Sequence, residues 1–274
     1  MKNTVKKSMG IFLPIVLFFL LSCTSSNKII QKSGDAEFYY KRGVGYLIGG
    51  QYDQAITDFN KAIEIKTGDS YYYHRRGIAY MNKGQYDQAI ADHSKAIEID
   101  PKFALGYIGR GDVYLSKGNY DQAILECNKA IEINPWRVQA YITRGIAYGS
   151  KGQHDQEIEN YNKVFEIDPR NASVYLVYNN RGLAYLDKGQ YDQAIADFGK
   201  ALDNNSLYGQ AYYNRAYVYY LKREYDKSWD DIKKAQDLGY DIKKAQELGY
   251  KIPAKFLDDL RKASGREKWG KGSG

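Results

Sequence analysis

One pattern of 34 residues recurs along this chain and constrains its fold more than any other feature. Residues 70–103 read SYYYHRRGIAYMNKGQYDQAIADHSKAIEIDPKF, and nearly the same pattern starts again at residue 104. Aligning the copies gives six units, which begin near Ala36, Ser70, Ala104, Val138, Tyr175 and Gly209. A unit of this length cannot bury its apolar face alone, so neighbouring units must stack against one another. The sequence therefore predicts a solenoid, with residues 36–240 as the array of repeats.

Each unit contains two apolar runs at helical spacing, separated by a break that reads Gly-Gln-Tyr-Asp or Gly-Asn-Tyr-Asp in most copies. The glycines of these breaks are Gly50, Gly84, Gly118, Gly152 and Gly189. Glycine just past the end of a helix adopts the left-handed conformation that a Cβ disfavours. In three units the second run ends before a proline, which stops a helix: Pro101, Pro135 and Pro169. Each unit is therefore predicted to be a helix-turn-helix pair, and the fold to be all-α.

Small and aromatic residues recur at fixed positions of the unit. In the second unit they are Tyr73 at position 4, Gly77 at 8, Tyr80 at 11, Ala89 at 20 and Ala96 at 27. The small residues let two helices approach closely, and the tyrosines fill the space beside them. This pattern resembles the tetratricopeptide repeat (TPR). The resemblance implies a right-handed α-solenoid of about six such repeats, whose first helices line a concave face that binds protein or peptide.

The fourth unit departs from the pattern at its centre. It has Glu157 and Val164 in place of the two alanines, and His154 in place of the tyrosine at the turn. Larger side chains where small ones are needed disturb close packing. We therefore expect the fourth unit to be the least well packed of the six.

The array is followed by a short tandem duplication. Residues 231–240 read DIKKAQDLGY and residues 241–250 read DIKKAQELGY. Ten residues rotate a helix by about 1000 degrees, so the two copies cannot share a face, and Gly239 is predicted to interrupt the helix. Residues 241–264 are predicted to hold the second copy and then a C-terminal capping helix with Phe256, Leu257 and Leu260. The basic, glycine-rich residues 265–274 are predicted to be a disordered tail.

The first 22 residues have the pattern of an export signal. Three lysines precede an apolar run at 11–21 that is too short to span a bilayer. The stretch Leu20-Leu21-Ser22-Cys23 resembles the lipobox of bacterial lipoproteins, which implies a signal peptide at 1–22 and lipidation of Cys23. The resemblance also implies that Thr24, which is not aspartate, permits sorting to the outer membrane, so the chain is expected to be lipid-anchored in the cell envelope, at the outer membrane and facing the periplasm. The alternative is an ordinary secretory signal with an incidental cysteine.

Residues 23–35 are short and polar and are predicted to be a flexible tether between the anchor and the array. The formal charge of +7 falls to +4 without the three lysines of the signal. A charge this small and dispersed argues against a nucleic-acid partner. Cys127 is predicted to be a small buried hydrophobe.

Nothing in the sequence has the spacing of a catalytic or metal site. The histidines, His74, His93 and His154, occupy three different repeat positions and lack the spacing of metal ligands. No nucleophile has a base that the sequence makes evident. We therefore expect no enzyme activity, no metal and no cofactor.

Arginine occupies position 7 of every unit, where the family usually has leucine, and position 23 is acidic in five units. The arginines are Arg42, Arg76, Arg110, Arg144, Arg181 and Arg215, and the acids are Asp58, Asp92, Glu126, Asp197 and Asp231, with Asn160 as the exception. The planar guanidinium suits bidentate bonding to a carboxylate. We predict a ladder of arginine–carboxylate pairs between the helices of each hairpin. The alternative is a basic ladder that binds an anionic polymer.

The resemblance places positions 2, 5, 9, 12 and 13 of each first helix on the concave face. Here these positions supply an apolar and aromatic candidate groove: Tyr40, Val44, Leu47, Tyr71, Ile78, Met81, Leu105, Ile108, Leu115, Ile142, Ile146, Leu183, Leu186, Tyr213, Tyr217 and Tyr220. Such a surface favours an amphipathic helix or an extended apolar peptide. The alternative is that these residues only pack between neighbouring first helices.

These observations predict a protein-binding scaffold or adaptor at the bacterial envelope, with a protein or peptide partner. One alternative is a regulator or accessory subunit of an envelope enzyme or machine that acts in peptidoglycan, pilus or outer-membrane assembly. Another is a self-assembling structural protein, because an apolar groove and an imperfect last repeat also suit stacking of copies.

Overall fold

The computed structural model describes residues 35–170, 174–242 and 255–265. All regular elements in these ranges are helices, and no strand occurs among them. The signal peptide, Cys23, the tether before Asp35, most of the second duplicated copy and the tail after Gly265 lie outside the described residues. None of the described helices combines the length and the apolar character needed to cross a membrane.

Twelve helices form six consecutive pairs that match the six predicted units. The pairs are α2 (Ala36–Ile48) with α3 (Tyr52–Ile65), α4 (Ser70–Asn82) with α5 (Tyr86–Ile99), α6 (Ala104–Ser116) with α7 (Tyr120–Ile133), α8 (Val138–Ser150) with α9 (His154–Ile167), α10 (Val174–Asp187) with α11 (Tyr191–Asn204), and α12 (Gly209–Leu221) with α13 (Tyr225–Asp237). A further helix, α15 (Phe256–Ser264), follows them.

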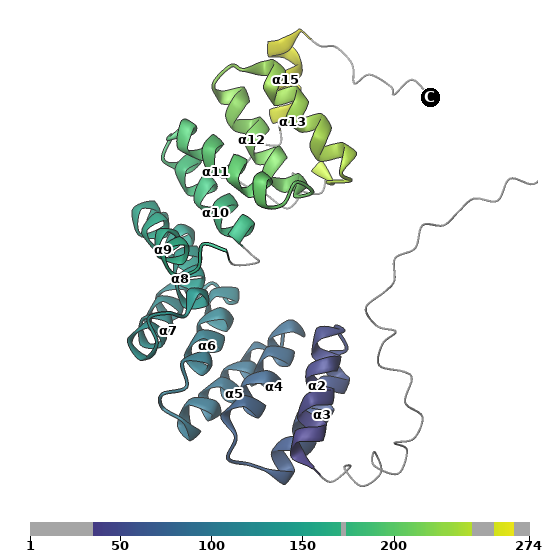
Figure 1. Cartoon of the computed structure of the whole chain (residues 1–274), viewed down its shortest axis with the longest axis vertical. Helices are drawn as coiled ribbons and strands as arrows, with labels where there is room; N and C mark the ends of the chain where they lie inside the picture. Colours follow the sequence, from purple (N-terminus) through teal and green to yellow (C-terminus); the bar gives the residue numbers. More distant parts are fainter. Residues whose placement is uncertain (1–34, 171–173, 243–254, 266–274) are drawn as a thin grey trace, which may run out of the picture.

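The pairs stack into an open curve (Figure 1). Each helix contacts its partner in the hairpin, and each second helix contacts the first helix of the next pair. In Figure 1 the first helices α6 and α8 lie toward the open side of the curve, and their partners α7 and α9 lie outside. The prediction of an all-α solenoid of six helix-turn-helix units is confirmed.

The turn inside each hairpin contains one residue in the left-handed helical conformation, with a positive φ. Gly84 has φ +74°, and the amide of the next residue, Gln85, donates to the carbonyl of Tyr80 at 2.9 Å. Four other predicted turn glycines have φ between +70° and +76°, as their sequence position predicts. In the sixth unit Arg223 takes this conformation, with φ 62°. A side chain with a Cβ is strained there, so the last hairpin has a less favourable turn.

Close helix approach in each hairpin relies on the small residues. A Cβ added at Gly77 would lie 2.8 Å from Cε1 of His93, and Ala89 is fully buried. The residue at position 24 of the unit lies on the second helix, and its side chain fills the space left by the glycine. Phe59 does so in the first unit and Phe198 in the fifth. The spacing of small residues in the sequence therefore sets the distance between the two helices.

The last repeat is closed by α15. Phe256 and Leu260 are buried in one cluster with Tyr213, Trp229 and Ile232. The Trp229 indole also donates to the Ser264 hydroxyl at 2.9 Å. Gly239 has φ +75° and lies just past the end of α13, so it interrupts the helix within the first copy of the duplication, as predicted. A helix therefore caps the C-terminal face of the array.

Candidate functional site

The arginines at position 7 lie between the two helices of their hairpins. Nε and Nη2 of Arg76 donate to the two carboxylate oxygens of Asp92 at 2.8 and 2.6 Å. Three other pairs have the same bidentate geometry: Arg42 with Asp58, Arg181 with Asp197, and Arg215 with Asp231. Burial lowers the pKa of Arg76, but its bonds to Asp92 outweigh burial, and the pKa is raised overall.

Two units deviate from this geometry. Arg110 reaches Glu126 through Nη2 alone, at 2.9 Å. In the fourth unit Arg144 Nε donates to the neutral amide oxygen of Asn160 at 2.8 Å. The fourth repeat therefore has a neutral partner where the other five have a carboxylate.

Four of the five arginines after the first also join two repeats, which the sequence did not lead us to predict, whereas Arg215 faces Gly199 and has no such bond within the described residues. Nη1 of Arg76 donates to Oδ1 of Asn60 in the preceding unit at 2.6 Å. The equivalent bonds run from Arg110 to Ser94, from Arg144 to Asn128 and from Arg181 to Asn162. The available signal was a recurring Asn or Ser at position 25. Arg42 has no preceding unit, and its side chain is 43% exposed against 19% for Arg76.

A second ladder runs along the edge of the array and was also missed. In the second to sixth units, a lysine just past the first helix pairs with an aspartate in the second helix of the preceding unit. The pairs are Lys83–Asp53, Lys117–Asp87, Lys151–Asp121, Lys188–Asp155 and Lys222–Asp192. The two ladders engage most of the repeated cations in pairs within the array, so the arginines do not form the open basic surface that an anionic polymer requires.

Three of the predicted groove residues are not open to a ligand. Ile108, Leu186 and Tyr213 are buried. Ile108 packs with Ala130 and Ala140, and Leu186 packs with Phe198 and Val218. Tyr213 packs against the C-terminal cap helix. For these three the prediction of an open groove position is wrong, because each first helix also has to pack against the first helix of the next unit.

The two tyrosines at the end of the predicted groove are covered in part by α15. The Phe256 ring lies 5.2 Å from the Tyr217 ring and 5.4 Å from the Tyr220 ring, measured between centroids. Burial raises the pKa of both phenols. The sequence predicts that Tyr217 and Tyr220 line the groove, and the cap helix occupies part of that surface.

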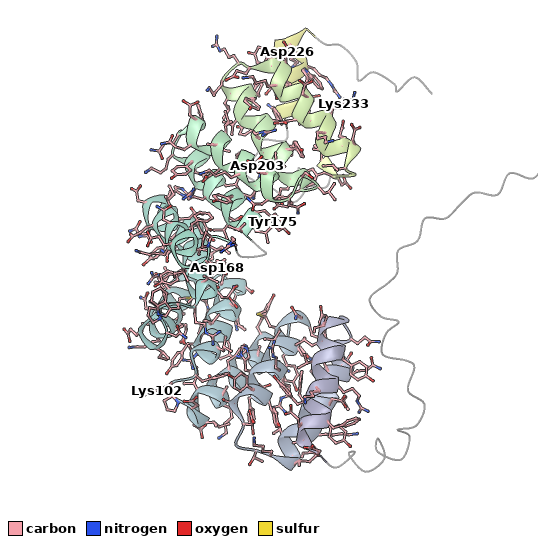
Figure 2. The ribbon with its side chains drawn as sticks, in the orientation of Figure 1. Lys102, Asp168, Tyr175, Asp203, Asp226 and Lys233 are labelled. Atoms are coloured by element: carbon pink, nitrogen blue, oxygen red, sulfur yellow. The ribbon has the colours of Figure 1, made fainter. Side chains whose placement is uncertain are left out.

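The remaining predicted groove residues keep part of their surface. Tyr40, Val44, Leu47, Ile78, Met81, Leu105, Leu115, Ile142, Ile146 and Leu183 are half-buried. Tyr71 is 47% exposed, with its ring edge-on to Phe103 at 4.7 Å. Further along, the Tyr175 side chain lies near the open side of the curve (Figure 2), with its ring edge-on to Tyr208. The concave face that stays accessible is therefore apolar and belongs mainly to the first five repeats.

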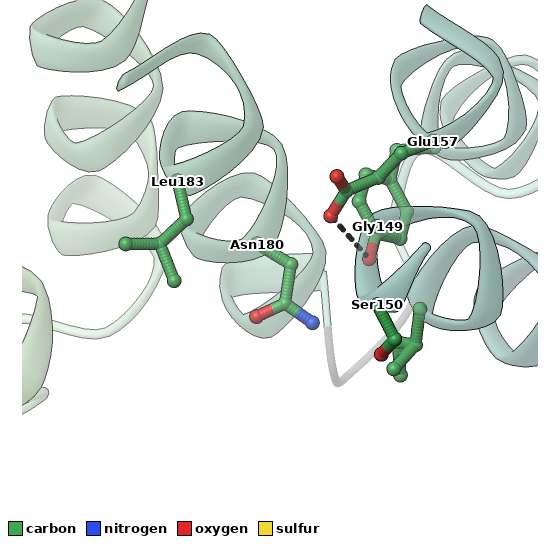
Figure 3. A pocket seen from close by; sticks show the side chains of 7 residues that line it. Gly149, Ser150, Glu157, Asn180 and Leu183 are labelled. Carbon is green, nitrogen blue, oxygen red and sulfur yellow. Dashed lines mark hydrogen bonds between the residues drawn. The ribbon is translucent and has the colours of Figure 1, made fainter. Parts of the chain in front are cut away.

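A cavity of about 230 Å³ opens between the fourth and fifth repeats. Its walls include Ile146 and Leu183 from the predicted groove, together with Ser150, Glu157, Tyr161 and Asn180 (Figure 3). Glu157 replaces the expected alanine, and a Cβ at Gly149 would lie 2.4 Å from its Cδ. The fourth repeat thus accommodates the larger side chain through a glycine on the facing helix, and it retains a cavity beside it.

Polar groups are also buried elsewhere along the array. The Thr143 hydroxyl donates to Asp112 Oδ1 at 2.6 Å, and burial raises the pKa of Asp112 to about 6. Burial lowers the pKa of His74 to about 3 and that of His93 to about 4. Burial raises the pKa of the Cys127 thiol to about 12, in keeping with a packing role. Within the described residues no group of His, Cys, Asp and Glu side chains could hold a metal ion.

Family models match most of the array. Two models of the tetratricopeptide repeat match residues 70–103 and 175–206, and residues 138–171. A model of the TPR repeat matches residues 45–84 and 111–152. Together these matches cover more than half of the chain. A comparison with curated proteins finds no match.

Solved structures with similar folds include MamA, which is 30% identical over 60% of this chain and 94% of its own length, with a TM-score of 0.51. A chain of the APC/C hetero-tetramer Cut9–Hcn1 is 16% identical, with a TM-score of 0.72 over 86% of this chain and 44% of its own. YrrB, described as a TPR protein with an unusual peptide-binding site, is 23% identical, with a TM-score of 0.54 over 69% of this chain and 96% of its own. At these identities the similarities to Cut9–Hcn1 and YrrB show a common fold and nothing more.

Proposed function

The chain belongs to the tetratricopeptide repeat family, and on that premise we propose that it is a scaffold that binds a protein or peptide partner on its concave face. The observation that carries this proposal is the apolar surface of the first five repeats, which the repeat packing and the cap leave accessible. An amphipathic helix or extended apolar segment buries such a surface.

Two further features support a binding role. The arginine and lysine ladders hold neighbouring repeats in a fixed orientation, so the face is formed before a partner arrives. Pre-formed surfaces lose less conformational entropy on binding. The peptide-binding site described for YrrB is a precedent on the same fold.

We also propose that this scaffold works at the bacterial envelope, attached through a lipid on Cys23 to the outer membrane. The support is the sequence alone: the short apolar run of the signal and the lipobox-like stretch before Cys23. In this location the partner is a component of an envelope assembly, and an accessory role beside an enzyme is one form of the same function. The buried cap on the last repeat argues against open-ended stacking of copies.

Cross-linked pull-down from membranes tests both parts of this proposal. We expect wild type and a Leu125→Ser control, altered at an exposed leucine of α7, to recover the same partner. Met81→Ser combined with Leu115→Ser should lose it while keeping the helical circular dichroism. Unchanged recovery by the double variant would contradict a groove site. Cys23→Ala should move the chain to the soluble fraction, and its retention on membranes would contradict the anchor.

A further inference from the structure

Two adjacent arginines of the second repeat differ in their bonding. Arg76 donates to Asp92 and to the preceding repeat, whereas the side chain of Arg75 forms no hydrogen bond or ion pair with the described residues. We propose that Arg75 binds an acidic side chain, glutamate or aspartate, of the partner segment in the concave face. This inference rests on the proposed function and specifies the chemistry of the partner at one point of the groove.

Arg75 lies at position 6 of its unit, and the residues at this position in later repeats show where such a side chain points. In the fourth repeat the Thr143 hydroxyl donates to Asp112, which is at position 9 of the third repeat. In the fifth repeat Asn180 lines the cavity that faces α8 (Figure 3). By the same register Arg75 points to the junction between α2 and α4, where position 9 of the first repeat is Val44. Arg75 therefore lacks the acid that Thr143 has.

The guanidinium of Arg75 is partly removed from water without compensation. Its Nε atom is buried and has no hydrogen-bond acceptor among the described residues, and the residue as a whole is half-buried. A guanidinium has five N–H donors, and a desolvated donor without an acceptor costs free energy. A carboxylate can accept from two of these N–H groups at once, because the guanidinium is planar. A partner carboxylate would thus supply what the array does not.

The charges of the surrounding surface favour an anion at Arg75. On the concave face of the first three repeats, the other charged side chains are already engaged. Glu37 lies 3.2 Å from Lys41, and Asp112 accepts from a hydroxyl. His74, next to Arg75, is neutral because burial lowers its pKa to about 3. Arg75 is therefore a positive charge without a counter-charge in an apolar surface, and complementary charge on a partner gives specificity.

Apolar surface flanks Arg75 on both sides along the array. Val44 and Leu47 belong to the first repeat, and Met81 and Leu115 to the second and third, and all four are half-buried. A partner segment that covers both flanks runs past Arg75, so its carboxylate comes from a side chain within the segment. An amphipathic helix with one acidic residue between apolar residues of the same face has this arrangement.

Selection of a library of random 12-residue peptides on the full chain tests this inference. We expect the selected peptides, made with amidated C-termini, to share a glutamate or aspartate between apolar residues. Arg75→Asn introduces the residue that Asn180 and Asn214 supply at this position, and it should weaken binding about 30-fold, because it removes one partner of a charge pair. Replacing the acid of a peptide by glutamine should cause a similar loss on wild type and little loss on the variant.

Further variants guard against a folding artefact. Arg75→Lys keeps the charge but not the planar geometry, so it should weaken binding less than Arg75→Asn. Val44→Asp places a carboxylate opposite Arg75, as Asp112 lies opposite Thr143, and should lose the acidic peptides while keeping the helical circular dichroism. Val44→Asn has the same shape without the charge and should bind them more tightly than Val44→Asp. Equal binding by these two variants would contradict the placement of the site between α2 and α4.

The outcomes separate the two proposals. If peptides bind, lose affinity with the Met81→Ser and Leu115→Ser changes, and bind Arg75→Asn as tightly as wild type, the Arg75 inference is overturned and the groove function stands. The Arg75 inference is overturned as well if the selected peptides have no acidic residue in common, or if amidation of the C-terminus abolishes their binding. If no peptide binds wild type, both proposals fail.

Discussion

The second and fourth repeats have the same backbone but differ in the charges at their centres. In the second, Ala89 is fully buried, Met81 occupies the position of Gly149, and Arg76 bonds to the carboxylate of Asp92. In the fourth, Glu157 lies under Gly149, and Arg144 bonds to the amide of Asn160. The fourth repeat thus lacks the acid at the arginine ladder and has one nearer the concave face.

The fourth repeat shows how this fold tolerates substitution at a small position. We expected the fourth repeat to pack least well because of Glu157 and Val164. In the structure Val164 is fully buried and Glu157 fits because Gly149 faces it, although a cavity remains. A change at one position of the hairpin is matched on the facing helix, while the turn and the lysine ladder keep their geometry.

The largest loss of stability is expected when the acid of the fourth repeat is placed at the equivalent position of the second repeat. We expect Ala89→Glu to lower the free energy of unfolding by about 4 kcal/mol, because the added carboxylate meets Met81 and has no room to reach the concave side. Urea denaturation followed by circular dichroism measures this loss.

A matched control follows from the fourth repeat itself. Adding Met81→Gly to Ala89→Glu recreates the pairing of Gly149 with Glu157 and should restore part of the stability, less about 1 kcal/mol for glycine within a helix. If Ala89→Glu alone is as stable as wild type, a glutamate at this position does not need a glycine on the facing helix, and Gly149 does not stabilise the fourth repeat by making room for Glu157.

The next largest difference in stability between the two repeats is expected at the arginine ladder. Arg76→Leu leaves Asp92 buried without its cation and should cost about 3 kcal/mol. Arg144→Leu leaves only neutral amides without a donor and should cost about 1 kcal/mol. Urea denaturation of both variants measures the difference, and equal losses would contradict it.

A double-mutant cycle isolates the pair in the second repeat. Combining Arg76→Leu with Asp92→Leu should recover much of the loss, because no uncompensated charge then remains. Additive losses would show that the two side chains do not act together.

The parts of the fold that could be predicted from the sequence depend on local pattern. Gly84 and Gly239 could be assigned because a helix end needs a left-handed residue, whatever packs nearby. The bond from Arg76 to Asn60 could not, since it joins different repeats and depends on how they stack. The burial of Tyr213 depends likewise on a helix more than 40 residues later in the chain. The contact between Gly149 and Glu157 could not be predicted either, because it depends on how the two helices of the hairpin are aligned along each other.

A further contrast between the two repeats concerns pH and lies at position 24. His93 fills this position in the second repeat, and burial lowers its pKa to about 4, from about 6.5 in an unfolded chain. A lowered pKa means that the neutral form stabilises the fold above pH 6.5 and that this stability is lost as the pH falls. Between pH 7 and 5 the loss from His93 should be about 2 kcal/mol.

His93→Phe, which introduces the residue found at this position in the first and fifth repeats, should remove that part of the pH dependence. Comparing urea denaturation of wild type and variant at pH 7 and pH 5 isolates it, because Asp112, whose raised pKa acts in the opposite direction, is present in both. Tyr161→Phe in the fourth repeat is the control. Burial raises the pKa of Tyr161 well above 10, so the phenol is neutral at both pH values and its removal should leave the pH dependence unchanged. An equal pH dependence in wild type and His93→Phe would mean that acid destabilises the array elsewhere than at His93, for example at His74, whose pKa burial also lowers.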